Sequence, residues 1–168
     1  MGACKELVTV LFAKGIQNIA YLGSNMDQMV NRCRYQGYEE AYRKGKRKLN
    51  QDLVYTDLSS RAMVEKAVEE LKNSGVECIL CQDDYICDEV VRKLARMGVR
   101  IPDQMKVASC HYSRILENYP ITITSLKFNI TELGRRSCQV LLDMIHGKTV
   151  PDKTLLDYEI ILKESTKG

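Results

Sequence analysis

The sequence lacks the features that mark several large protein classes. None of its apolar runs is long enough to cross a bilayer. Residues 1–6 lack the basic start and apolar core of a secretion signal, and Glu6 stands where a myristoylation motif requires Ser or Thr. The net charge of +3 is too small to indicate a nucleic-acid partner by itself. We therefore expect a cytoplasmic protein with no membrane partner.

The short motifs of common enzyme mechanisms are missing too. Gly23 follows the first predicted strand, but no further glycines follow at the spacing of a dinucleotide-binding GxGxxG. The sequence also contains no P-loop, HExxH or GxSxG. It gives no local support for phosphate, zinc or hydrolase chemistry, and we expect no cofactor and no enzyme.

The cysteine pattern does not favour a metal site. The seven cysteines are an odd number in mostly apolar settings, which indicates buried thiols in a reducing compartment. Cys78 and Cys81 form a CxxC, a spacing found in zinc and redox sites. They fall in a predicted strand, however, where residues three apart point to opposite faces. We therefore predict that the two thiols do not converge.

The features that are present indicate one globular α/β domain. The chain has 168 residues, of which 45% are hydrophobic and 28% charged. Strand-like and helix-like periodicity alternate along it, with short connections. The expected strands cover about 16–22, 52–56, 77–82, 105–110, 121–128 and 155–162, and the expected helices about 3–14, 26–46, 59–73, 84–97 and 129–146. This order predicts a doubly wound parallel sheet with helices on both faces.

Ligands of such sheets bind beyond the carboxyl ends of the strands. Arg34 lies early in the second helix, where its planar guanidinium can turn toward this edge and hold hydroxyls, a carboxylate or a phosphate. The alternative is a solvated arginine beside Arg32. At the end of the third strand, Asp84 is expected to cap the following helix, which leaves Asp83 free to accept hydrogen bonds from a ligand. In the alternative, Asp83 only shares the capping.

The fourth strand ends in Cys110 and His111. A cysteine beside a histidine suggests a nucleophile, but adjacent residues of an extended chain face opposite ways. We favour His111 as a ligand or loop residue, and predict that Arg34, Asp83 and His111 form one wall of a hydroxyl-binding pocket. A small cytosolic α/β enzyme that uses Asp83, His111 or Cys110 is the alternative.

The densest positive run, residues 43–48, falls at the predicted end of the second helix. Cations are favoured there by the helix dipole, so we interpret the run as a solvated helix end. A nucleic-acid contact is the alternative.

Six segments, in order, resemble the lac repressor and galactose repressor (LacI/GalR) family. They are LFAKG with NIAYLG (11–15 and 18–23), RYQGYEEA (34–41), ILCQDD (79–84), GVRIPD with VAS (98–103 and 107–109), ITSL with ELG (123–126 and 132–134), and the ending KEST (163–166). The second resembles the family's RxxG[FYW]xxA and the last its usual REST. The match covers nearly the whole chain.

The resemblance implies a type I periplasmic-binding-protein-like fold and a role in transcription regulation. Family members carry a helix-turn-helix head, a hinge and a two-lobed effector domain. Residues 1–120 and 150–168 resemble the second lobe, and residues 121–149 resemble a crossover and the last helix of the first lobe, while the DNA-binding head is absent. The implied function is the effector-binding and dimerisation portion of a sugar- or small-molecule-responsive repressor, which contacts operator DNA only through the head. A periplasmic-type sugar-binding protein is the alternative, and the KEST ending favours the repressor.

The resemblance also implies roles for single residues. Arg34 matches the family's ligand-binding arginine, and Asp83 matches a ligand-contacting Asn or Asp. Leu58 falls near a ring that often stacks on the ligand, and His111 falls where a ligand-binding Asp is common. Because Leu58 and His111 depart from the pattern, an ordinary hexose is a doubtful effector, although a carbohydrate or related polyol is expected. The residues expected at a homodimer interface are Tyr119, Cys87, Val90, Val91 and Leu94. The helix over 129–146 packs into the first lobe in the family, so its apolar face is expected to be covered here by association.

Overall fold

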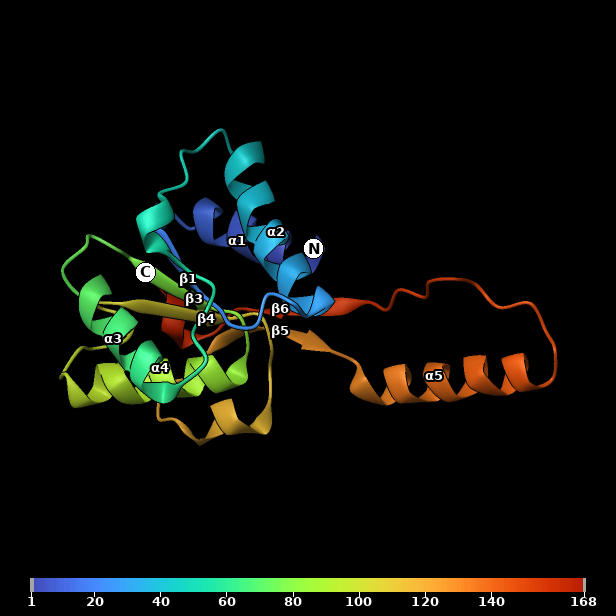
Figure 1. The fold of residues 1–168 in the computed structure, drawn as a ribbon. Coiled ribbons are helices and arrows are strands. Elements are labelled where there is room, and N and C mark those ends of the chain that lie inside the picture. Colours follow the sequence, from blue (N-terminus) through green and yellow to red (C-terminus); the bar gives the residue numbers. More distant parts are fainter. Residues whose placement is uncertain (1, 168) are drawn as a thin grey trace.

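A six-stranded sheet forms the centre of the structure, a computed structural model that describes residues 2–167 (Figure 1). The strands are β1 (Ile19–Leu22), β2 (Val54–Tyr55), β3 (Cys78–Cys81), β4 (Lys106–Ser109), β5 (Thr124–Phe128) and β6 (Tyr158–Ile161). Their order across the sheet is β2-β1-β3-β4-β5-β6. The first five strands run parallel, as predicted, but β6 is antiparallel to β5. The prediction of a wholly parallel sheet is therefore wrong at its last strand.

Four helices cover the two faces of this sheet. Helices α1 (Gly2–Ala13) and α2 (Met29–Lys44) lie on one face, and α3 (Arg61–Leu71) and α4 (Asp84–Arg96) lie on the other (Figure 1). Short 3-10 turns occur at η1 (Gln51–Leu53), η2 (Arg114–Asn118) and η3 (Glu164–Thr166). Each helix and strand expected from the periodicity is present, which confirms the doubly wound α/β fold.

The sheet separates two hydrophobic cores. Successive side chains of a strand point to opposite faces, so Tyr21 and Leu80 pack against α1 and α2, whereas Ala20 and Ile79 pack against α3 and α4. The same alternation puts Cys78 in the first core and Cys81 in the second. The prediction that these two thiols diverge is confirmed.

Two tyrosines of α2 bind it to the first strand. The Tyr38 hydroxyl donates a hydrogen bond to the carbonyl of Ile19 at 2.7 Å, and the Tyr42 hydroxyl accepts one from the Ile19 amide at 3.1 Å. Tyr38 is fully buried, and burial raises its pKa far above the ordinary value. Its hydroxyl therefore stays protonated. Arg34 precedes Tyr38 by one helical turn and lies on the same side of α2, toward the end of β1.

A fifth helix, α5 (Ile130–Ile145), extends away from this body (Figure 1). None of its residues is buried, and Leu133, Leu141, Leu142 and Met144 are among its exposed apolar side chains. The chain leaves the sheet after β5 and returns at β6, so the extended segment covers residues 129–157. The predicted boundary at 121–149 is therefore displaced, because β5 pairs with β4 and belongs to the sheet. Within residues 2–167, no helix is both long and apolar enough to span a membrane.

Close packing at the end of β1 requires glycine at position 23. A Cβ atom there would lie 2.6 Å from Oε1 of Gln82 and 2.7 Å from Cε1 of Tyr21. Both neighbours are fully buried, so neither side chain has room to move away.

We therefore expect Gly23→Ala to lower the free energy of unfolding by about 1–3 kcal/mol, the usual cost of overpacking a core. Urea unfolding followed by circular dichroism measures the change. Gly134→Ala is the matched control, because no atom beyond the neighbouring stretch of its own helix lies within 4 Å of the added methyl, and we expect it not to lower stability. An unchanged midpoint in Gly23→Ala would show that the packing at this strand end is loose.

The C-terminal turn η3 packs against both β4 and β5. The hydroxyl of Ser165 donates to the Val107 carbonyl at 2.6 Å and accepts from the Thr124 amide at 2.9 Å. Ser165 is fully buried. Its hydroxyl therefore satisfies two backbone groups that water cannot reach.

Ser165→Ala leaves both backbone groups without that partner, and we expect a loss of about 1–3 kcal/mol in the free energy of unfolding. The exposed Ser137 of α5 provides the control substitution to alanine, for which we expect no measurable loss. Equal unfolding midpoints for the two variants would contradict the anchoring role of Ser165.

Candidate functional site

A pocket of about 340 Å³ opens at the carboxyl edge of the sheet. Its lining comes from the start of α1, the first half of α2, the end of β4, β5 and the start of α5. Arg34 and His111 are its charged or polar members, together with the thiols of Cys4, Cys33 and Cys110. The remaining lining is apolar. The pocket can therefore hold a small molecule against one cation, one imidazole and a largely hydrophobic wall.

Arg34 is the only arginine or lysine in the lining. Its side chain is half-buried, and it takes part in none of the ion pairs or hydrogen bonds found among residues 2–167. By contrast, its neighbour Arg32 is exposed and donates to the carbonyl of Met26 at 2.8 Å. A half-buried guanidinium without a protein partner is suited to a carboxylate, phosphate or paired hydroxyls.

His111 faces the same pocket as Arg34. Its ring is stacked against Phe128, with 6.4 Å between ring centroids and 28° between ring planes. Ser109 holds its backbone, since the Ser109 hydroxyl donates to the His111 carbonyl at 2.8 Å. Cys110 lines the same pocket, and its thiol is fully buried and donates to the thiol of Cys4 at 3.5 Å. That the side chains of Cys110 and His111 face opposite ways stays a prediction.

Asp83, not Asp84, caps helix α4. Oδ1 of Asp83 accepts from the Ile86 amide at 2.9 Å, and Asp84 is the first residue of the helix. The prediction of Asp84 as the cap is therefore wrong by one residue, because the extended backbone that a cap needs occurs at Asp83. Asp83 is absent from the lining of the pocket. Of the three residues expected to share a wall, the structure brings together Arg34 and His111 only.

Gln82 is a residue at this edge that sequence reasoning missed. It is fully buried, and its side-chain oxygen accepts from the Ser24 amide at 3.2 Å and from the Tyr21 hydroxyl at 3.3 Å. Its amide nitrogen lies 3.4 Å from Oδ2 of Asp83. Gln82 thus joins the loop after β1 to the end of β3. A glutamine at the end of an apolar strand was the available signal, because a buried amide has to find partners.

Leu58 also lies near the strand ends, but its side chain faces away from the pocket. It is buried in the core between the sheet and the α3–α4 layer, and its amide donates to the Gly23 carbonyl at 3.0 Å. The pocket borders the opposite face, next to α1 and α2. The expected ligand contact of Leu58 is therefore not supported by its position in this structure.

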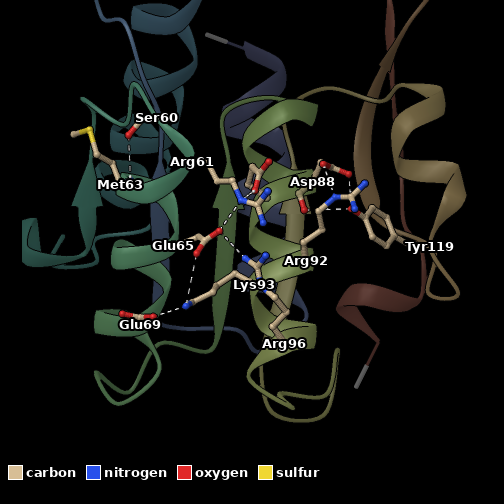
Figure 2. Close-up of polar contacts among 11 residues, drawn as sticks. Ser60, Arg61, Met63, Glu65, Glu69, Asp88, Arg92, Lys93, Arg96 and Tyr119 are labelled. Atoms are coloured by element: carbon tan, nitrogen blue, oxygen red, sulfur yellow. Dashed lines mark hydrogen bonds and ion pairs between the residues drawn. The ribbon is translucent and has the colours of Figure 1, made fainter.

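Four of the five residues expected at a dimer interface are buried within this chain. The four of them that lie on α4 are only 0–4% exposed, because they pack into this chain's own core: Cys87, Val90, Val91 and Leu94. Tyr119 is half-buried and donates to Asp88 of α4 (Figure 2). Helical periodicity found the apolar face of α4, and the chain's own sheet covers that face.

Ionic contacts occupy the surface between α3 and α4. Glu65 accepts from Arg61 at 2.7 Å and from Arg96 at 2.6 Å, and Lys93 bridges Glu65 and Glu69 (Figure 2). These groups satisfy one another within one chain. The surface between α3 and α4 is therefore charged, and its charges are paired.

The basic run at the end of α2 is held within the chain. Arg43 pairs with Glu40, and Arg47 lies over the ring of Phe12 at 4.4 Å. The helix ends at Lys44, so these cations lie in and just after its last turn. Their contacts favour a solvated helix end. Among residues 2–167, no group of three or more His, Cys, Asp or Glu side chains is arranged to hold a metal ion.

Comparison with known proteins gives a consistent assignment. Residues 8–166 match the family described as periplasmic binding protein-like domain. Curated relatives include the HTH-type transcriptional regulator CelR of Thermobifida fusca, 25% identical over 98% of this chain and 49% of its own, and GntR of Escherichia coli K12, 26% identical over 91% and 46%. The chain thus spans about half the length of the curated relatives it matches.

Solved structures show the same fold. A LacI transcriptional regulator of Bacillus cereus subsp. cytotoxis has a TM-score of 0.90 at 22% identity, covering 99% of this chain and 60% of its own. A complex of the regulator CelR with cellobiose has a TM-score of 0.86 at 24% identity, covering 98% and 51%. The chain belongs to the periplasmic binding protein-like domain family, and the curated relatives named above are HTH-type transcriptional regulators.

Proposed function

We propose that this chain is the effector-binding part of a sugar- or small-molecule-responsive transcription regulator. The observation that supports this most directly is the unpaired, half-buried Arg34 beside His111, in a pocket of about 340 Å³ at the carboxyl edge of the sheet. Ligands of open α/β sheets bind at this edge. DNA binding is assigned to a helix-turn-helix head outside these 168 residues.

The lining favours an acidic sugar derivative over a neutral hexose. Arg34 provides a guanidinium, and no aspartate or glutamate lines the pocket to accept hydrogen bonds from several hydroxyls. Phe128 supplies an apolar surface on which a sugar ring can pack. We therefore propose an effector that combines hydroxyl groups with a carboxylate, the latter paired with Arg34.

Regulation would follow from a difference in effector affinity between two arrangements of the domain. An effector shifts such an equilibrium only by as much as it binds one state more tightly. Residues of α2, of α5 and of the segment that follows β4 line one pocket, so an occupant that binds all of them would hold these elements together. We propose that this coupling changes the relative position of the DNA-binding heads.

We also propose that the chain acts by binding and not by catalysis. Cys110 is fully buried, and its thiol donates a hydrogen bond to Cys4. Asp83 is engaged in capping α4. Each of these groups is thus engaged with a partner other than His111. Turnover of a screened substrate that is lost in His111→Ala would contradict this assignment.

The exposed α5 is proposed to mediate association with a second copy of this chain. None of its residues is buried and its leucine, isoleucine and methionine side chains are half or more exposed, and such surfaces tend to be buried by association. The helix extends from the body, so it is free to lie against another α5 or to exchange with it (Figure 1).

Arg34→Ala is predicted to weaken the binding of a sugar acid to this chain. Gluconate is the probe and glucose the neutral comparison, and titrations of the ¹⁵N-labelled chain monitor amide shifts around Arg34 and His111. A charged hydrogen-bonded pair is typically worth about 1.5–3 kcal/mol, which corresponds to a loss of affinity of roughly 10- to 150-fold.

Arg43→Ala is the control, because Arg43 lies on the same helix but pairs with Glu40 outside the pocket. Equal shifts with glucose and gluconate would contradict the acidic effector. Shifts that avoid the pocket altogether would contradict the proposed site.

Replacing Leu142 of α5 by Asp is predicted to weaken self-association without loss of the fold. Leu142 is half exposed, so a charge there costs the single chain little but disrupts an apolar contact between copies. Sedimentation equilibrium over a range of concentrations gives the dimerisation constant. Gln139→Glu is the control, because it adds a negative charge to the same helix at a polar position. We expect it to leave the dimerisation constant nearly unchanged. A wild-type chain that remains monomeric at millimolar concentration would refute the proposal.

A further inference from the structure

Three of the seven cysteines line the same pocket. Cys4 comes from the first turn of α1, Cys33 from α2, and Cys110 from the residue after β4. The Cys110 thiol donates to the Cys4 sulfur at 3.5 Å, although the two residues lie 106 positions apart in the sequence. Both are free thiols. The fold therefore places a close dithiol in the wall of the pocket.

The two sulfurs are close enough to bond after a small movement. A disulfide requires an S–S distance of about 2.05 Å, so the pair has to approach by roughly 1.5 Å. Cys4 lies in the first turn of α1, and Cys110 lies one residue beyond its strand. Ends of helices and strands adjust more readily than their centres.

The pair Cys81 and Cys87 provides an internal comparison. Burial, together with the neighbouring Cys87 thiol, raises the pKa of Cys81 far above its ordinary value. Both residues are buried in the core between the sheet and the α3–α4 layer. Neither lines the pocket, so of these two pairs a reagent that enters there meets only the pair formed by Cys4 and Cys110, with Cys33 as a third, separate thiol in the lining.

Access and charge favour a small, neutral reagent. The hydrogen bond with Cys110 and burial raise the pKa of Cys4, and the positive charge of Arg34 partly opposes this shift. The Cys4 thiol is therefore mostly protonated, and its thiolate is partly stabilised by the positive charge of Arg34. A hydroperoxide is uncharged and small enough for a pocket of about 340 Å³.

We propose that Cys4 and Cys110 form an oxidisable dithiol that closes to a disulfide when a small hydroperoxide enters the pocket. In the first step one thiolate attacks the O–O bond, which gives a sulfenic acid and releases the alcohol, or water from hydrogen peroxide. In the second step the other thiol attacks the sulfenic sulfur, the S–S bond forms and one water leaves. The peroxide is reduced by two electrons, and the two thiols supply them.

The disulfide would join the start of α1 to the end of β4. It would close a long loop of the chain, which stabilises a fold when the native geometry tolerates the bond. It would also tie together two elements that line the pocket. This chemistry is independent of the proposed effector, so its test stands apart from the titration with gluconate.

The test uses the complete 168-residue chain under native conditions. Hydrogen peroxide is added, remaining thiols are blocked with iodoacetamide, and tryptic peptides are analysed by mass spectrometry. We expect a linked pair of peptides, residues 1–5 and 107–114, each with a single cysteine, and a mass two hydrogens below the sum of the reduced peptides. We also expect a rise of several degrees in the melting temperature that dithiothreitol reverses.

Matched variants separate this pair from other thiol chemistry. Cys4→Ala and Cys110→Ala should each remove the linked pair, whereas Cys81→Ala should leave it unchanged. If circular dichroism shows that an alanine variant does not fold, the wild-type chain oxidised in urea is used as the control instead. In urea, we expect the linked pair to be no more abundant than other cysteine pairs. Oxidation confined to Cys33 or Cys138, or a linked pair that is equally abundant in urea, would overturn the proposal.

Discussion

The attachment of α2 to β1 is the contact on which the rest of the pocket depends. The hydroxyls of Tyr38 and Tyr42 meet both backbone groups of Ile19, and the rings of Tyr21 and Tyr38 pack with 5.2 Å between centroids. A buried hydroxyl must find a partner, so α2 has little freedom to rotate or slide along the strand. Arg34 lies one turn before Tyr38. Its guanidinium is therefore placed at the carboxyl edge by contacts made in the core.

Polar groups at this edge divide into two sets with different tasks. Gln82, Asp83 and Asn31 satisfy the backbone of the surrounding turns, as Asn31 shows by donating to the carbonyls of Ser24 and Asn25 at 3.0 Å. Arg34 and His111 make no comparable side-chain hydrogen bonds among the described residues and face the pocket. The first set gives the loops one conformation. The second set is thereby left free for a ligand, which is the usual requirement for a preorganised site.

Periodicity in the sequence was sufficient to predict the helices and strands, but not the direction of each strand or the surface against which each helix packs. The alternation of apolar residues identified each strand, yet it is the same for either strand direction, so it could not reveal that β6 runs antiparallel to β5. The sequence offers two adjacent aspartates as possible helix caps, and Asp83 is the cap because its backbone is extended. The spacing of Cys87, Val90 and Leu94 marked an apolar face of α4 but not which surface covers it.

The candidate site was predictable in part, for a similar reason. Arg34 and His111 follow the rule that ligand groups gather beyond strand ends, and both line the pocket. Leu58 follows a strand as well, but an aliphatic side chain at that position gains more from the core between the sheet and the α3–α4 layer than from a solvated edge. The contact between Cys4 and Cys110 joins residues 106 positions apart, and no local pattern reports such a pair.

Helix α5 contributes to the pocket, so a surface that packs against this helix would also affect the pocket. Ile130 and Leu133 belong to its first turns and also line the pocket, although the rest of the helix extends away from the body. A surface that binds the apolar face of α5 would therefore fix one wall of the pocket. By linkage, an occupant that prefers the fixed wall must strengthen binding at α5 by the same factor. If both proposals hold, α5 is therefore the element through which self-association and ligand affinity would be coupled.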